Sequence, residues 1–144
     1  MAYPLLDIDG PSHDPYCGRV GLFRAQALLT GPTGATEEVD LLVDTGSTLL
    51  VVTADIADRL GLTPQWTQAV VVAGGRRETW PVAEVRLLVG DRAVTTPCFI
   101  APGGQPLLGA VALESLFLAV DPVARRLVPV EGFVGNTMRL IRSA

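Results

Sequence analysis

One acidic residue, Asp44, lies in an otherwise apolar stretch of the chain. Leu41-Leu42-Val43 precede it, and Leu49-Leu50-Val51-Val52 follow the polar segment Thr45-Gly46-Ser47-Thr48. A carboxylate in such surroundings loses hydration, which costs several kcal/mol unless the group is paired or hydrogen-bonded. Two interpretations remain open: Asp44 accepts backbone N–H groups in a turn where Gly46 has a positive φ, or Asp44 activates water as a catalytic group.

Hydrolysis by carboxylates requires a pair of them. Two carboxylates about 3 Å apart share one proton, so one accepts a proton from the attacking water while the other donates to the carbonyl oxygen. The chain has no second Asp-Thr-Gly or Asp-Ser-Gly, and Asp9-Gly10, Asp91-Arg92 and Asp121-Pro122 lack the surrounding apolar run. The second carboxylate must therefore come from a second copy of the chain, in a homodimer that places both Asp44 residues at its twofold axis.

Residue counts exclude several other chemistries. All eleven basic residues are arginine, so no lysine is present to bind phosphate or form a Schiff base. The single histidine, His13, and the two cysteines, Cys17 and Cys98, have no metal-ligand spacing, and no Gly-x-Ser-x-Gly motif is present. We expect no metal and no cofactor. The net charge of −4 argues against a nucleic-acid partner.

The apolar runs are too short to predict a membrane partner. None reaches the roughly 18 consecutive apolar residues of a spanning helix. The N-terminus lacks the basic segment and apolar core of a signal peptide. Two cysteines in 144 residues do not make a disulfide framework, which favours a reducing, cytoplasmic setting.

A length of 144 residues predicts a single domain. Residues 1–17 are rich in turn-forming pairs and are interpreted as an N-terminal arm, 18–132 as the domain, and 133–144 as a C-terminal tail and candidate dimer strand. Thr53–Leu60 predicts a helix capped by Thr53 and ended by Gly61. Apolar patterning predicts strands at 19–29, 38–43, 49–52, 69–72, 79–89, 93–100, 118–120 and 126–130, with a second helix at 110–116.

These elements indicate a mainly antiparallel β domain, and two segments carry a family resemblance. Leu42-Val43-Asp44-Thr45-Gly46-Ser47-Thr48 resembles the active-site segment of the retropepsin-like aspartic proteases. Leu107-Leu108-Gly109 and the helix after it resemble the apolar pair, glycine and helix that support that segment, and the following stretch is similar to small prokaryotic members. The resemblance covers residues 18–130. It implies a mainly β, closed-barrel acid protease fold with one or two short helices and one lobe per chain.

The resemblance also implies roles for individual residues. Asp44 is expected to be the catalytic aspartate, one from each subunit, and Thr45 to hydrogen-bond across the dimer axis. Gly46 is expected to bring its backbone close to the carboxylates and donate an N–H to them, and Ser47 to hydrogen-bond the outer carboxylate oxygen. Structural support for the site is expected from Leu107, Leu108 and Gly109.

A glycine-tipped hairpin is expected to form the flap over the substrate. Its tip is Ala73-Gly74-Gly75-Arg76. Arg76 and Arg77 either bias the site toward acidic or polar peptides or solvate the loop. Trp80 either lines a substrate subsite or packs in the core.

The function that follows is that of a homodimeric aspartic endopeptidase. Its substrate is expected to be an extended protein or peptide segment that adds as a strand between flap and floor. The alternative is a module of the same fold that only dimerises or binds peptides, with weak or no catalysis. Replacing Asp44 by asparagine separates the two, because it keeps the shape and removes the acid–base function.

Overall fold

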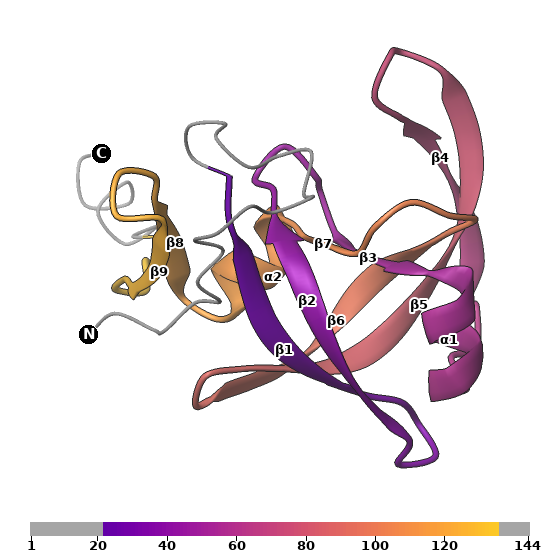
Figure 1. Cartoon of the computed structure of the whole chain (residues 1–144), viewed down its shortest axis with the longest axis horizontal. Coiled ribbons are helices and arrows are strands. Elements are labelled where there is room, and N and C mark those ends of the chain that lie inside the picture. The colour runs from indigo at the N-terminus through magenta and orange to yellow at the C-terminus, as the bar shows by residue number, and fades with distance from the viewer. Residues whose placement is uncertain (1–21, 136–144) are drawn as a thin grey trace, which may run out of the picture.

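The computed structural model describes residues 22–135, which form nine strands and two short helices. Figure 1 shows their arrangement. In chain order they are β1 (Arg24–Thr30), β2 (Thr36–Val43), β3 (Leu50–Thr53), α1 (Ala54–Leu60), β4 (Trp66–Val71), β5 (Arg77–Val89), β6 (Arg92–Ala101), β7 (Leu107–Leu108), α2 (Ala110–Ser115), β8 (Leu118–Asp121) and β9 (Arg126–Pro129).

Seven of these strands form one sheet that closes on itself. The strand order is β1-β2-β7-β3-β6-β5-β4, and β1 also pairs with β5, so six strands make a ring with β4 outside it. Most pairings are antiparallel, whereas β2–β7 and β3–β6 are parallel. Strands β8 and β9 form a separate two-stranded sheet. The expected mainly antiparallel β architecture is therefore confirmed.

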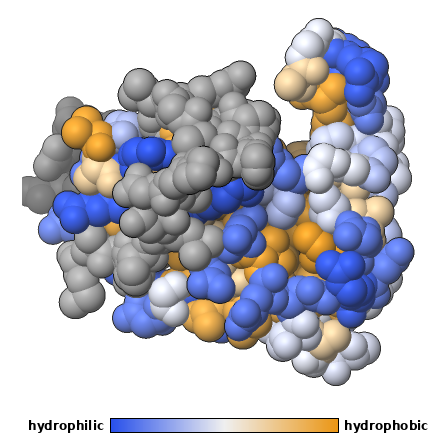
Figure 2. Space-filling view, viewed as in Figure 1, coloured by the Kyte–Doolittle hydropathy of each residue, from blue (hydrophilic) through white to orange (hydrophobic). Residues whose placement is uncertain are grey.

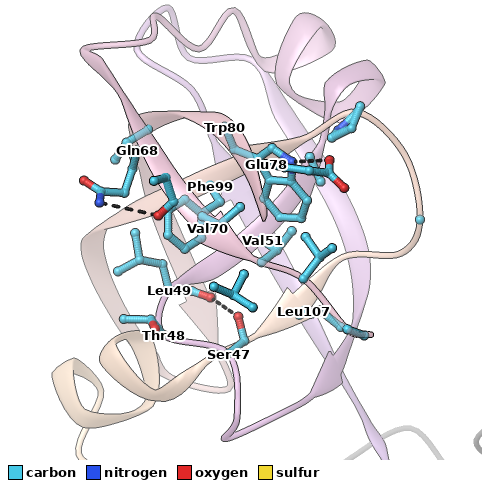
Figure 3. A pocket seen from close by; sticks show the side chains of 18 of the residues that line it. Ser47, Thr48, Leu49, Val51, Gln68, Val70, Glu78, Trp80, Phe99 and Leu107 are labelled. Carbon is cyan, nitrogen blue, oxygen red and sulfur yellow. Dashed lines mark hydrogen bonds between the residues drawn. The ribbon is translucent and has the colours of Figure 1, made fainter. Parts of the chain in front are cut away.

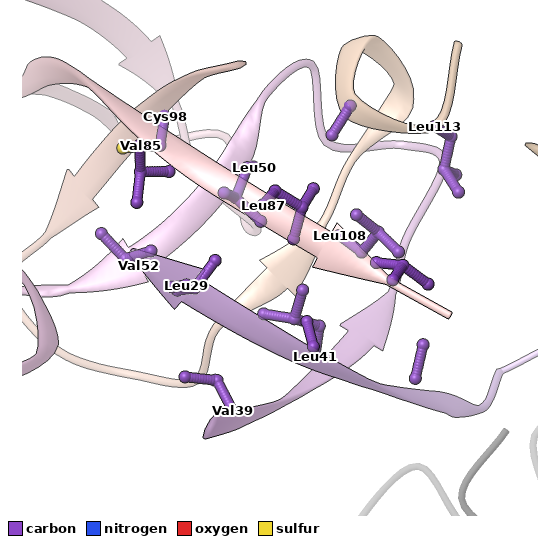
Figure 4. Packing of buried hydrophobic residues seen from close by; sticks show 14 of the residues in the cluster. Leu29, Val39, Leu41, Leu50, Val52, Val85, Leu87, Cys98, Leu108 and Leu113 are labelled. Carbon is purple, nitrogen blue, oxygen red and sulfur yellow. The ribbon is translucent and has the colours of Figure 1, made fainter. Parts of the chain in front are cut away.

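The interior of the ring holds the hydrophobic core. Alternate residues of β1 are buried, as the period of two of a half-buried strand requires, whereas all of β3 is buried. Figure 4 shows the packing around Leu41, Leu50, Leu87 and Leu108. Cys98 is fully buried in this cluster, and burial raises the pKa of its thiol to about 12. Cys98 is therefore an apolar packing residue.

Helix α1 begins and ends almost where its sequence predicts. Gly61 ends the helix in the left-handed conformation, with φ 65°, and its N–H donates to the Asp58 carbonyl oxygen. Thr53 occupies the N-cap position without making a side-chain cap bond, because its hydroxyl donates to the Asp55 carboxylate. The expectation that the Thr53 side chain caps the helix is wrong in this respect.

A long hairpin formed by β4 and the first half of β5 projects from the ring (Figure 1). The register pairs Trp66 with Val82 and Val71 with Arg77. Gly74 and Gly75 turn the chain with φ values of 94° and 86°, which favour glycine. The predicted hairpin and its tip are thus present.

Several expectations fall on the chain ends. The arm 1–17, with His13 and Cys17, lies outside the described residues, as does most of the tail. Phe133–Gly135 are described and form no strand. Across residues 22–135, no helix is long and apolar enough to cross a membrane.

Candidate active site

The loop of residues 44–49, called the Asp44 loop below, connects β2 to β3 and is attached to the segment that follows β6. The Asp44 N–H donates to the Leu108 carbonyl oxygen over 3.0 Å. Strand β7 reaches this position because it lies between β2 and β3, parallel to the first and antiparallel to the second. Leu107 and Leu108 thus hold the end of β2 from which Asp44 emerges.

The first turn of α2 holds the other end of the loop. The N–H groups of Ala110 and Val111 donate to the carbonyl oxygens of Ser47 and Thr48, over 2.8 and 3.0 Å. The first N–H groups of a helix have no partner inside the helix, so they are available for such contacts. The loop carbonyl oxygens therefore provide acceptors for the first N–H groups of α2, and the same hydrogen bonds hold the loop in place.

Gly109 allows this close approach. A Cβ atom at this position would lie 2.3 Å from the Leu49 carbonyl oxygen and 2.6 Å from that of Ser47. The φ angle of Gly109 is −96°, which other residues also adopt. Glycine is needed here because of space and not because of backbone conformation.

Within the loop, Asp44 is half-buried and accepts a backbone hydrogen bond. The Gly46 N–H donates to Asp44 Oδ1 over 2.9 Å. Gly46 is not among the positive-φ glycines of the described chain, so the turn interpretation left open above has its backbone hydrogen bond but not its left-handed glycine. The Ser47 hydroxyl donates to the Leu49 carbonyl oxygen over 2.8 Å, where a bond to the carboxylate was expected. Thr45 is exposed beside Asp44.

A cleft of about 1170 Å³ lies between the Asp44 loop and the β4–β5 hairpin. Asp44, Gly46, Ser47, Ala73, Arg76 and Leu107 line it, so the cleft brings together residues predicted for the site, the flap and the support. The other predicted residues, Thr45, Gly74, Gly75, Leu108 and Gly109, are not among its lining. In Figure 2 the hairpin stands clear of the body of the molecule, with hydrophobic and hydrophilic residues near its end.

The hairpin presents a polar group and an aromatic ring to the cleft. Glu78 and Trp80 line it, and Glu78 Oε1 accepts a hydrogen bond from Trp80 Nε1 over 3.0 Å (Figure 3). Glu78 Oε2 accepts from Arg76 Nε over 2.9 Å. The Trp80 bond first, and then Arg76, lower the pKa of the Glu78 carboxyl. The Trp80 ring contacts Phe99 edge to face, with centroids 6.1 Å apart.

These contacts bear on two alternatives left open above. Trp80 lines the cleft, which favours the subsite interpretation. Arg76 is paired with Glu78 and its side chain is 73% exposed, which favours the interpretation that it solvates the loop. Among the described residues, no group of three or more His, Cys, Asp or Glu side chains could hold a metal ion.

Sequence reasoning missed part of the cleft. It did not identify Glu78, Phe99 or Gln105 as lining residues. Gln105 lies after the Pro102-Gly103-Gly104 turn, and its Oε1 accepts a hydrogen bond from Arg24 over 2.6 Å. For Glu78 a partial signal existed: it directly precedes the predicted strand 79–89 and is two residues from Trp80, the spacing of one strand face. No local signal places Phe99 or Gln105.

Comparison with known proteins agrees with this geometry. A family model described as aspartyl protease matches residues 29–112. Among solved structures, the EIAV protease complexed with the inhibitor HBY-793 superposes with a TM-score of 0.52 at 20% identity, covering 65% of this chain and 86% of that one. The solution structure of the Simian Foamy Virus (mac) protease gives 0.47 at 18% identity, covering 62% and 90%. No curated protein matches. The chain thus has the retropepsin-like fold and belongs to the aspartyl protease family.

Proposed function

We propose that this protein is an aspartic endopeptidase that acts as a homodimer, with a catalytic pair made of Asp44 from each subunit. The observation that carries the proposal is that the cleft contains two carboxylates per chain, Asp44 and Glu78. Glu78 is engaged on both oxygens by Trp80 and Arg76, and it lies on the opposite side of the cleft from the Asp44 loop. One chain therefore offers one aspartate for catalysis, and a second copy supplies the other.

In the dimer the two Asp44 carboxylates share a proton, because two adjacent negative charges repel each other. The ionised carboxylate accepts a proton from water as the water attacks the peptide carbonyl carbon. The protonated carboxylate donates to the carbonyl oxygen. The carboxyl that took the water proton then gives it to the leaving nitrogen, while the other carboxylate takes a proton from a hydroxyl of the tetrahedral intermediate, and the peptide bond breaks.

The backbone of the Asp44 loop orients the pair. Gly46 donates its N–H to Asp44 Oδ1, and Leu108 accepts from the Asp44 N–H, so the carboxylate and its backbone are held from two sides. The exposed Thr45 side chain is available to hydrogen-bond the partner loop across the axis. Residues held in this way need little rearrangement during the reaction.

The β4–β5 hairpin closes over the substrate as a flap, with Ala73, Gly74, Gly75 and Arg76 at its tip. Two observations support this role: the hairpin lies above the cleft, and its tip contains two glycines with positive φ. An extended peptide lies between flap and floor and adds backbone hydrogen bonds there.

The protease domain is assigned to residues 18–132, the arm to 1–17 and the tail to 133–144. The chemistry requires no cofactor, and the cytoplasmic setting stays a prediction.

The experiment compares wild-type protein with Asp44→Asn on a diverse peptide pool, with cleavage products identified by mass spectrometry. High protein concentration keeps the dimer assembled. Asp40→Asn is the matched control, because Asp40 is exposed on β2 and does not line the cleft. We expect cuts with wild type and Asp40→Asn, and a loss of at least about a thousandfold with Asp44→Asn.

Cleavage that survives in Asp44→Asn would contradict the proposed catalytic pair. Peptide binding without any cleavage by wild type would favour the binding-module alternative.

A further inference from the structure

The underside of the flap carries side chains in a fixed order. The β4–β5 register places Val70 opposite Glu78, Gln68 opposite Trp80 and Trp66 opposite Val82. All six line the cleft. A carboxylate at this place is costly unless its oxygens are satisfied, so the partners of Glu78 define its role.

Both oxygens of Glu78 are occupied within the hairpin. Oε1 accepts from Trp80 Nε1 over 3.0 Å, and Oε2 accepts from Arg76 Nε and Nη2 over 2.9 and 2.5 Å. The Arg76 side chain is 73% exposed and that of Glu78 25%. Glu78 therefore connects Arg76, at the tip of the hairpin, with an aromatic ring deeper in the cleft.

The ring that Glu78 holds forms one wall of an apolar recess. Trp80 contacts Phe99 edge to face, and Phe99 is the register partner of both Val51 and Val82. Figure 3 shows Val51 between the Trp80 ring and Ser47, with Leu107 beside Ser47. A side chain of a bound peptide that points toward Trp80 would therefore meet mainly apolar and aromatic surface next to the Asp44 loop.

We propose that Glu78 is a positioning residue that fixes the Trp80 indole as the wall of this recess, so that the cleft selects substrates with a bulky apolar side chain there. The inference rests on the proposed function for the identity of the ligand, an extended peptide. Glu78 is given a positioning role because each of its oxygens already accepts a hydrogen bond from within the hairpin, Oε1 from Trp80 and Oε2 from Arg76. Without Glu78, the indole N–H loses its acceptor and the ring turns out of place.

Binding is measured with Asp44→Asn protein, which holds peptides without cutting them. The probes are two fluorescein-labelled peptides with an alanine and serine background, one with Phe-Phe at its centre and one with Arg-Arg. Fluorescence anisotropy gives each dissociation constant. We expect the Phe-Phe peptide to bind more tightly. Equal or tighter binding of the Arg-Arg peptide would overturn the proposal, since it would mean that Glu78 exchanges Arg76 for a basic substrate side chain.

Substitutions at Glu78 and Trp80 separate positioning from direct contact. Glu78→Ala should weaken binding of the Phe-Phe peptide about tenfold, the value of one hydrogen bond to a charged group. Glu78→Gln keeps an acceptor oxygen for the indole and should stay within about threefold of the parent, because a neutral acceptor keeps about half the bond strength. Trp80→Phe keeps a ring but no N–H, and its effect should not add to that of Glu78→Ala. Additive effects, or equal losses in the alanine and glutamine variants, would overturn the proposal.

The matched control is Glu84→Ala, because Glu84 is exposed on the same strand and does not line the cleft. It should leave both dissociation constants unchanged. A direct view of the ring comes from Trp80 emission in a Trp66→Phe background, where Trp80 is the single tryptophan. Glu78→Ala should shift this emission in the absence of peptide, and an unchanged spectrum would contradict the positioning role.

The two proposals fail in different ways. If wild-type protein binds the Phe-Phe peptide with the expected ranking and never cuts it, the peptidase function fails and the positioning role stands. If wild type cuts peptides while Glu78→Ala shows the same cleavage preference and KM, the positioning role fails and the peptidase function stands.

Discussion

Gly109 and Gly46 are both small residues at the Asp44 loop, for related steric reasons. At position 109 a Cβ atom would overlap two carbonyl oxygens of the loop, at 2.3 and 2.6 Å. At position 46 it would lie 3.1 Å from Asp44 Oδ1, the atom to which the Gly46 N–H donates. In both cases a backbone must come close to a polar neighbour, and neither residue has a positive φ.

Gly109→Ala should therefore lower the free energy of unfolding by about 3 kcal/mol, because the added methyl meets rigid backbone atoms. The loop would also shift from α2, and peptide cleavage should fall with it. Gly103→Ala is the control, since nothing lies within 4 Å of a Cβ there, and it should change stability by less than about 0.5 kcal/mol. Urea unfolding measures both, and equal midpoints for the two variants would contradict this account.

At the scale of elements, the β4–β5 hairpin, which is the proposed flap, contains an ionised contact between Arg76 and Glu78. Glu78 and Trp80 lie two residues apart on β5 and so share one face, Arg76 directly precedes the strand, and all three line the cleft. The rest of the hairpin's stability comes from β4–β5 pairing, because most of β4 is exposed and contributes little to the core. A local electrostatic contact can therefore influence the flap without affecting the ring.

The hydrogen bonds of Glu78 with Trp80 and Arg76 should persist in acidic solution. The Trp80 and Arg76 hydrogen bonds lower the pKa of Glu78 from its ordinary 4.5, so the interaction is complete above that value and is lost as pH falls through the lowered pKa. Trp80 emission in the Trp66→Phe background should change with a midpoint below pH 4.5. Glu78→Gln should show no such transition. A midpoint above 4.5 would mean that the carboxylate is not held as described.

At the scale of the whole molecule, the proposed chemistry needs two chains, because each chain would supply one of the two Asp44 carboxylates. The ring of six strands is complete within one chain and holds its own core, so folding does not by itself require a partner. The proposed chemistry does require one. Dilution should therefore lower the activity, because the dimer dissociates, while each chain stays folded.

Mixing subunits tests this dependence on a second copy. An equal mixture of wild type and Asp44→Asn that exchanges subunits contains about a quarter wild-type dimers, and heterodimers hold a single carboxylate. The wild-type protein should then lose about half of its activity, whereas equal addition of Asp40→Asn should not reduce it. Activity that is unaffected by Asp44→Asn, under conditions where exchange is shown by mass spectrometry, would mean that one chain is sufficient.

The sequence by itself determined the parts of this protein that depend on local pattern. The apolar run around Asp44 and the glycine tip at 74–75 predicted the polar loop and the hairpin, whereas the supporting role of the Leu-Leu-Gly segment and the flap role of the hairpin came from the family resemblance. Each of these is encoded by neighbouring residues, since strand alternation, turn glycines and a polar interruption act over a few positions. The alternation in β5 would also have placed Glu78 beside Trp80.

The tertiary structure alone decided which distant groups meet. Phe99 reaches Trp80 because β6 pairs with both β3 and β5, and Gln105 reaches Arg24 because the ring brings their segments together. Strand register and strand order set these contacts. The partner of a side chain across the ring therefore depends on the path of the whole chain and not on its neighbours in sequence.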